Sequence, residues 1–391
     1  MKSVSRLGIL GIVALAAGLG GCGSKDSSRD SNELTVKIGS AAPLSGPQAH
    51  LGKDNENGAR LAIDEANARG VTIGGKKAKF VLIGEDDQAD PRTATIVAQK
   101  FADRQVKGVI GHLNSGASIP ASKIYADHGI VQISPSATAV AYTAQGFKTA
   151  FRVMTNDRQQ GKVLGEYAVK KMGAKRVALI DDRTAYGQGL ADEVEKAVKA
   201  AGGEVVAREY TSDRSTDFTA ILTSIKGKSP EVVFFGGMDP QGAPIAKQMH
   251  GLGLKAKFLA GDGVQTHEFT KLAGTAAQGV TASMPGLPLD RMPGGKTFRE
   301  RFNAKYGPIQ NYAPYAYDAV NAMIEAMVRA GSPEPAKYLP ELAKLRFTGV
   351  TGDIAFDAKG DILSGAITLY QVKGSHWEVL ETVLGEASGK N

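Results

Sequence analysis

The chain has 391 residues, enough for two domains of ordinary size, and its 42% hydrophobic and 22% charged residues are typical of a soluble globular protein. The formal net charge is +7, but two of the positive charges, Lys2 and Arg6, lie in the N-terminal segment, and the others are scattered along the chain. The sequence has no long basic run and no alternation of basic with aromatic residues, which argues against a nucleic-acid-binding protein.

The first 22 residues have the pattern of a targeting signal. Lys2 and Arg6 form a basic start, and Leu7–Leu19 is an apolar stretch of secretory length that is too short to span a bilayer stably. The stretch ends in Leu-Gly-Gly-Cys, which resembles a bacterial lipobox. A lone cysteine is often just a small buried residue, but Cys22 is the only cysteine and precedes a polar segment. We therefore expect residues 1–22 to be a lipoprotein signal peptide, with Cys22 as the site of lipidation.

A polar segment separates this signal from the fold. Residues 23–33 show no apolar periodicity and predict a flexible tether. Gly23, not an aspartate, follows Cys22, so no signal for retention in the inner membrane of a Gram-negative cell is visible. These features predict a periplasmic protein held at the membrane only by its lipid, on the outer membrane if the cell is Gram-negative. With one cysteine, the mature chain has no partner for an intramolecular disulfide.

From residue 34 the chain alternates short apolar runs with amphipathic segments. The runs are rich in Val, Ile and Phe and are bounded by turn-forming or charged residues, which is typical of buried parallel strands. Two series of strands are predicted, at 36–38, 80–83, 109–110 and 130–133, and at 177–180, 205–206, 232–235 and 258–260. Helices are expected between them and near the end, at 190–200, at 314–330 and around the apolar face formed by Ala59, Ala62, Ile63 and Ala66. Two such series predict an α/β protein with two parallel-sheet lobes, which bind ligands beyond the carboxyl ends of the strands.

Six segments in fixed order carry a resemblance to a known family. They are 43–46 (PLSG), 86–91 (DDQADP), 111–118 (GHLNSGAS), 133–138 (ISPSAT), 181–189 (DDRTAYGQG) and 312–320 (YAPYAYDAV). Together they resemble the leucine/isoleucine/valine-binding proteins of ABC importers, over nearly all of residues 34–391. The resemblance implies the periplasmic binding protein type I fold, in which two doubly wound lobes with a ligand cleft between them are joined by three chain crossings. One lobe would hold residues 34–155 and 284–362, and the other residues 156–283 and 363–391.

The resemblance also implies an amino-acid site at the turns that follow the strands. A buried zwitterion needs donors for its carboxylate, an anion for its ammonium group and a shaped apolar pocket. The carboxylate would bind the hydroxyls of Ser115 and Thr138 and the backbone N–H groups around Ser136, Ala137 and Thr138, at an expected helix start. Helix N-capping is the ordinary alternative for such Ser and Thr residues. Asp262, one methylene shorter than the family's usual glutamate, would pair with the ammonium group, and a simple turn aspartate is its alternative.

The apolar part of the site departs from the family pattern. The resemblance places Tyr186 over the ligand from the second lobe and makes Tyr312 and Tyr315 candidates for the far wall, although tyrosines at this spacing also fit a helix core. Leu51 and Met238 stand where aromatic residues are frequent, which predicts a more adaptable wall. Leucine, isoleucine and valine remain the expected ligands, and a larger or more polar amino acid, such as phenylalanine or an amide-bearing one, stays open.

Several absences bear on the function. The family's disulfide is missing, because Ala89 and Asn114 occupy the matching positions. A near match to a phosphate-binding loop has Lys77 where Ser or Thr is required, and Lys271 replaces the second histidine of a zinc-protease pattern. We therefore expect a monomeric binding protein without a metal or other cofactor, not an enzyme, whose partner is an ABC transporter permease. A ligand-sensing receptor of the same fold is the main alternative, and a two-lobed hydrolase is the third.

Overall fold

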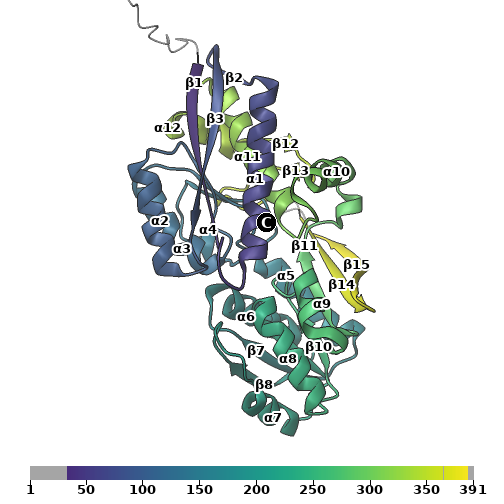
Figure 1. The fold of residues 1–391 in the computed structure, drawn as a ribbon. Coiled ribbons are helices and arrows are strands. Elements are labelled where there is room, and N and C mark those ends of the chain that lie inside the picture. Colours follow the sequence, from purple (N-terminus) through teal and green to yellow (C-terminus); the bar gives the residue numbers. More distant parts are fainter. Residues whose placement is uncertain (1–32, 364, 386–391) are drawn as a thin grey trace, which may run out of the picture.

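The first of two α/β lobes is built on a six-stranded sheet (Figure 1), in a computed structural model that describes residues 33–363 and 365–385. The strand order is β2-β3-β1-β4-β5-β6, with β2 antiparallel to β3 and the other neighbours parallel. Its strands are β1 Glu33–Ala42, β2 Thr72–Ile73, β3 Lys76–Asp86, β4 Val109–Gly111, β5 Gln132–Ser134 and β6 Ala150–Arg152.

The second lobe contains a seven-stranded sheet with the order β15-β14-β11-β10-β9-β7-β8. The strands from β8 to β11 are parallel, whereas β14 and β15 add an antiparallel pair at the β11 edge. Its strands are β7 Arg176–Asp181, β8 Glu204–Tyr210, β9 Val232–Gly236, β10 Lys257–Ala260, β11 Thr281–Pro285, β14 Ala366–Lys373 and β15 His376–Leu384. The two sheets and their helices confirm the predicted fold class.

Helices cover both sheets, as the alternating pattern predicts. Those of the first lobe are α1 Ala49–Arg69, α2 Pro91–Asp103, α3 Ser115–Asp127, α4 Ala141–Ala144, α10 Gly295–Tyr306, α11 Ala313–Arg329 and α12 Pro335–Ala343, with the small pair β12 Phe347–Thr348 and β13 Asp353–Ile354. Those of the second lobe are α5 Asp157–Glu166, α6 Ala185–Ala200, α7 Thr219–Gly227, α8 Asp239–Gly251 and α9 His267–Ala273. The predicted apolar face of α1 is buried, and the helix ends at Gly70, which takes the left-handed conformation (φ 66°) that favours glycine.

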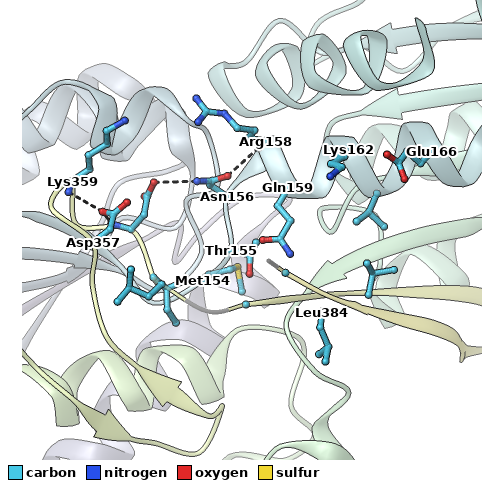
Figure 2. A pocket seen from close by; sticks show the side chains of 17 residues that line it. Met154, Thr155, Asn156, Arg158, Gln159, Lys162, Glu166, Asp357, Lys359 and Leu384 are labelled. Atoms are coloured by element: carbon cyan, nitrogen blue, oxygen red, sulfur yellow. Dashed lines mark hydrogen bonds between the residues drawn. The ribbon is translucent and has the colours of Figure 1, made fainter. Parts of the chain in front are cut away.

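The chain passes three times between the lobes. Residues 153–156 lead from β6 to α5, residues 286–294 lead from β11 back to α10, and residues 355–365 lead to β14, with residue 364 outside the description. A cavity of about 440 Å³ lies beside the first and third crossings, where the side chain of Asn156 donates to Asp361 at 3.1 Å (Figure 2). None of the predicted ligand-binding residues lines this cavity, so it is separate from the cleft.

The predicted signal peptide, Cys22 and all but the last residue of the predicted tether lie outside the described residues. That last residue, Glu33, begins β1. Within residues 33–363 and 365–385, no helix is long and apolar enough to cross a membrane.

Candidate ligand site between the lobes

The predicted polar residues follow the carboxyl ends of parallel strands. Ser115 begins α3 after β4, and Thr138 follows β5, both in the first lobe. In the second lobe, Tyr186 lies in the first turn of α6 after β7, Met238 precedes α8 after β9, and Asp262 follows β10. This is the edge at which open α/β sheets bind ligands, because the strand order reverses there and leaves a crevice. All five residues are buried, which indicates that the cleft is closed in this structure.

Asp262 is the centre of a hydrogen-bond cluster that spans both lobes. Its Oδ1 accepts the Tyr186 hydroxyl at 2.8 Å and the Gln160 side-chain amide at 2.7 Å, both from the second lobe. Its Oδ2 accepts the hydroxyl of Tyr312, from the first lobe, at 2.7 Å. Burial raises the pKa of Asp262 and outweighs these hydrogen bonds, which act in the opposite direction. The structure thus brings Tyr186, Tyr312 and Asp262 together as neighbours.

The first lobe contributes two buried hydroxyls. Oγ of Ser115 accepts the backbone N–H of Ala139 at 3.1 Å and keeps its own hydrogen to donate. It does not cap α3, whose N-cap residue is Asn114. Oγ1 of Thr138 is buried and has no partner with good hydrogen-bond geometry among the described residues, and it lies near the carboxylate of Asp157. An unpaired buried hydroxyl is costly, so these two groups are suited to receive a polar ligand.

The expected helix start around Ser136, Ala137 and Thr138 is wrong. These residues form an irregular loop, and the short helix α4 begins only at Ala141. The backbone N–H groups of Ser136 and Ala137 both donate to Oγ of Ser134, at 3.3 and 2.9 Å. Because these two N–H groups are already bonded within the loop, they are not free to bind an anion.

Asp157 is a buried acidic residue that the sequence analysis missed. It is the first residue of α5, and its backbone N–H donates to the carbonyl of Thr138 at 2.8 Å, which places the two residues side by side. Among the described residues, neither carboxylate oxygen has a partner with good hydrogen-bond geometry, although the Thr138 hydroxyl lies close enough to lower the Asp157 pKa. Burial, and then the charge of Asp262, raise the pKa of Asp157 well above its usual range. An aspartate directly after Asn156, at the start of a helix that follows a strand, was the available signal, but such residues are ordinarily caps.

The three clustered tyrosines have three different surroundings. Only Tyr312 reaches the acidic centre. The hydroxyl of Tyr315 donates to the carbonyl of Pro285 at 2.8 Å, next to the second chain crossing. The hydroxyl of Tyr317 donates to Glu65 of α1 at 2.7 Å. Of the three tyrosines, Tyr312 is therefore the candidate for the site, whereas the hydroxyls of Tyr315 and Tyr317 make contacts away from the acidic centre.

Leu51 and Met238 lie on different sides of the site. Leu51, in the first turn of α1, is fully buried and belongs to the same large apolar cluster as Tyr186, Tyr312 and Met238. Met238 and Tyr186 line a cavity of about 350 Å³ whose other walls come from both lobes, including Asn114 and Thr184. This cavity adjoins the acidic centre through Tyr186.

Arg152 organises the loop that carries Thr138. The side chain is fully buried at the end of β6, and its Nη1 donates to the carbonyls of Ala137 and Ala139, at 2.8 and 3.0 Å. Its Nε donates to Asp361 of the third crossing at 2.6 Å. Arg152 therefore holds the residues on both sides of Thr138 and ties them to the crossing.

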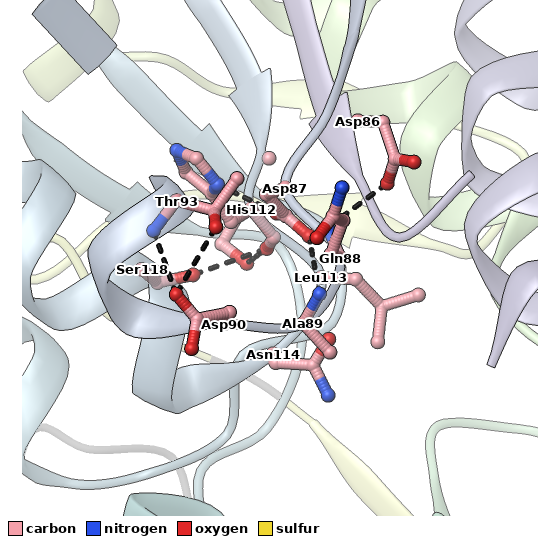
Figure 3. Close-up of polar contacts among 12 residues, drawn as sticks. Asp86, Asp87, Gln88, Ala89, Asp90, Thr93, His112, Leu113, Asn114 and Ser118 are labelled. Atoms are coloured by element: carbon pink, nitrogen blue, oxygen red, sulfur yellow. Dashed lines mark hydrogen bonds and ion pairs between the residues drawn. The ribbon is translucent and has the colours of Figure 1, made fainter. Parts of the chain in front are cut away.

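A second buried pair holds the loop that carries Ser115 (Figure 3). Nδ1 of His112 lies 2.7 Å from Asp87, and its Nε2 lies 3.0 Å from the hydroxyl of Tyr125. The carbonyl of His112 accepts the hydroxyls of Ser118 and Ser134. These contacts indicate a structural role for His112, and they join the two loops that hold Ala89 and Asn114, the positions of the family's disulfide.

The two lobes, the buried polar cleft and the three crossings define a class of protein, the solute-binding proteins that enclose a small molecule between two domains. A family model described as periplasmic binding protein matches residues 35–376, and the chain belongs to this family. Proteins of this kind bind substrates for transporters and are not enzymes, which confirms the expectation for this chain.

Individual relatives agree with this assignment. A Leu/Ile/Val-binding protein homolog 1 from Brucella abortus (strain 2308) is 39% identical over 329 residues, which cover 83% of this chain and 87% of that protein. A leucine-binding protein, LivK, from Thermotoga maritima has a TM-score of 0.83 and 28% identity, covering 89% of this chain and 98% of its own. LivJ from Streptococcus pneumoniae, solved in complex with isoleucine, has a TM-score of 0.81 and 29% identity, covering 90% and 100%. The predicted resemblance to the leucine/isoleucine/valine-binding proteins is thus confirmed.

Proposed function

We propose that this protein binds leucine, isoleucine or valine between its lobes and delivers it to the permease of an ABC importer. Relatives named for these ligands support the proposal, and so does LivJ, which was solved with isoleucine. The observation that carries it is the set of buried groups with spare hydrogen-bonding capacity, namely the Thr138 hydroxyl and the Asp157 carboxylate beside Asp262. A hydroxyl donor and a pair of carboxylates are what a bound zwitterion needs at its two charged groups.

The polar groups divide between the two ends of the amino acid. Ser115 and Thr138 would donate to its carboxylate, while Asp262 and Asp157 would surround its ammonium group. Burial raises the pKa values of both carboxylates, and the charge of Asp262 raises that of Asp157 further. A cation placed between them removes both penalties. Closure is therefore favoured when the ligand is present, since the ligand contacts both lobes.

The side chain of the ligand would face Tyr186, Tyr312, Leu51 and Met238. The cavity beside Met238 and Tyr186 leaves room beyond a branched aliphatic side chain, so a larger amino acid is the alternative ligand.

The remaining features of the proposal concern location. We propose that Cys22 carries a lipid, that residues 23–33 act as a tether, and that the monomer is held on the periplasmic side of the membrane. Residues 34–155 and 284–362 would form the first lobe and residues 156–283 and 363–391 the second. Growth with radiolabelled palmitate tests the anchor: label should enter the wild-type chain and be absent from Cys22→Ser.

Thermal denaturation with each of the twenty amino acids tests the ligand. A ligand at a hundred times its dissociation constant should stabilise the folded state by about 2.7 kcal/mol, and we expect this shift with leucine, isoleucine and valine. The variant Ser115→Ala/Asp262→Ala should lose the shift while keeping its circular dichroism. Tyr317→Phe is the matched control, because its hydroxyl bonds Glu65 of α1 instead of the acidic centre. A shift with none of the twenty amino acids would overturn the proposal, and a shift with another amino acid alone would overturn only the choice of ligand.

A further inference from the structure

Among the described residues, one contact between a carboxylate and a basic side chain joins the two lobes. His50 lies in the first turn of α1, at the end of this helix that faces the second lobe (Figure 1). Its Nε2 is 2.9 Å from Oδ2 of Asp239, the first residue of α8. The same oxygen accepts the hydroxyl of Thr266 at 2.7 Å, and Oδ1 has no hydrogen-bond partner among the described residues. The side chain of Asp239 is fully buried, and the only basic group that contacts it among the described residues is His50, from the other lobe.

The surroundings of His50 favour its protonated form. Burial lowers its pKa, but the hydrogen bond to Asp239, the charges of Asp239 and of Glu268 in α9, and the Pro47 carbonyl all raise it, and the net pKa lies above the usual value. A neutral imidazole has one N–H, whereas the imidazolium donates from both nitrogens. Only the imidazolium adds a positive charge to the contact that Nε2 makes with the Asp239 carboxylate.

We propose that His50 and Asp239 form a closing pair, in which protonation of His50 stabilises the closed arrangement of the lobes and slows release of the ligand. Opening moves His50 away from Asp239 and returns its pKa toward the ordinary value of about 6.5. Because the pKa of His50 is higher in the closed form, its protonation stabilises that form, and this stabilisation is complete at pH values below the open-form pKa. This stabilisation is lost as the pH rises through the closed-form pKa. Each unit of difference between the two pKa values changes the closed-to-open ratio by up to about tenfold.

A second contact across the cleft provides a matched control. The Asn311 side chain donates to the carbonyl of Gln265 at 2.8 Å, also from the first lobe to the second, and neither group titrates in this pH range. Asn311→Ala should weaken closure equally at every pH, whereas His50→Gln should remove only the pH-dependent part. Asp157 and Asp262 also titrate in the cleft, so the effect of His50 is the difference between the wild type and His50→Gln.

The test measures lobe separation directly and does not depend on the identity of the ligand. In the full chain with Cys22→Ser, spin labels at Lys123→Cys of α3 and Lys196→Cys of α6 report the distance between the lobes, since both positions are exposed. We expect a larger closed fraction at about pH 5.5 than at about pH 8, and tighter leucine binding by isothermal titration calorimetry over the same interval. Both trends should be weaker in His50→Gln, by the part that His50 contributes, and should keep their full size in Asn311→Ala.

Each outcome decides one claim. If neither the label distance nor leucine affinity depends on pH, or if His50→Gln keeps the same dependence, the closing pair does not control closure. If leucine fails to bind but the label distance still responds to pH through His50, the proposed ligand is wrong and the closing pair stands.

Discussion

Replacing Tyr312 by phenylalanine measures how much ligand retention depends on one hydrogen bond across the cleft. Tyr312 is the residue just before α11 in the first lobe, and its hydroxyl donates to Oδ2 of Asp262 in the second lobe, with both groups buried. Tyr186 donates to Oδ1 of the same carboxylate from α6, within the second lobe. The two bonds are similar in length and partner. Only the Tyr312 bond breaks when the lobes separate, which makes the tyrosines a matched pair.

The expected magnitude follows from the charge of the acceptor. A hydrogen bond to a charged group contributes about 1.5–3 kcal/mol. Because the open form lacks the Tyr312 bond, Tyr312→Phe removes this free energy from closure and hence from binding. Leucine affinity should fall by about ten- to a hundredfold. Tyr186→Phe removes a bond present in both forms, so it should lower the free energy of unfolding and change affinity much less.

Isothermal titration calorimetry with leucine and urea denaturation of the free protein separate these effects. The reasoning predicts a large affinity loss with a small stability change for Tyr312→Phe, and the reverse for Tyr186→Phe. Equal affinity losses in the two variants would refute the claim that the Tyr312 bond acts through closure. An unchanged affinity in Tyr312→Phe would show that its bond to Asp262 persists in the open form or contributes nothing to it.

Three further predictions follow from buried charges. Asp157→Asn removes a buried carboxylate that lacks a well-formed hydrogen bond among the described residues. Calorimetry should show leucine binding weaker by about 2 kcal/mol or more, and urea denaturation should show a more stable free protein. Unchanged affinity would exclude Asp157 from the site. Arg152→Met leaves the carboxylate of Asp361 without its cationic partner and should lower the free energy of unfolding, measured in urea, by about 3–5 kcal/mol. A loss below about 1 kcal/mol would contradict the stabilising role of this pair. Burial raises the pKa of Asp182 to about 6, so the folded state binds the proton more tightly than the unfolded state. The free energy of unfolding should then fall by on the order of 3 kcal/mol as the pH rises from about 4 to about 6. Asp182→Asn should flatten this slope when unfolding is followed by the fluorescence of Trp377, the only tryptophan, and an equal slope in the variant would assign the pH dependence to another group.

The fold was predictable because burial on both faces of a parallel sheet leaves continuous apolar runs. Strand β9 shows this most clearly, since all five of its residues are buried. The boundary of β5 was less accurate, because Ile130 and Val131 are buried and apolar yet precede the first paired residue, Gln132. Apolar character records burial, whereas a strand also requires pairing with a neighbour.

The site was predictable where its residues follow a strand and match a family motif, and less so elsewhere. Ser115 and Tyr186 satisfy both conditions, whereas Asp262 follows a strand but replaces the family's usual glutamate. Arg152 satisfies neither, because nothing in its local sequence shows that it will be buried against Asp361, 209 residues further along the chain. Asp157 was missed for a related reason. Its local position is that of an ordinary helix-start aspartate, and only the tertiary contact with Thr138 places it in the cleft.

The partners of Asp262 explain how a buried carboxylate can remain available to a ligand. Two tyrosine hydroxyls and one amide donate to it, and all three are neutral. Neutral donors replace the lost hydration of the carboxylate without cancelling its charge, whereas a lysine or arginine in their place would neutralise it and leave no attraction for an ammonium group. The buried arginine of the first lobe is instead paired with Asp361 at the crossing. His50, which contacts the second lobe from the first, is paired with Asp239. In the proposed function, this separation of the structural charges from the ligand-binding charge would keep Asp262 available for the amino acid.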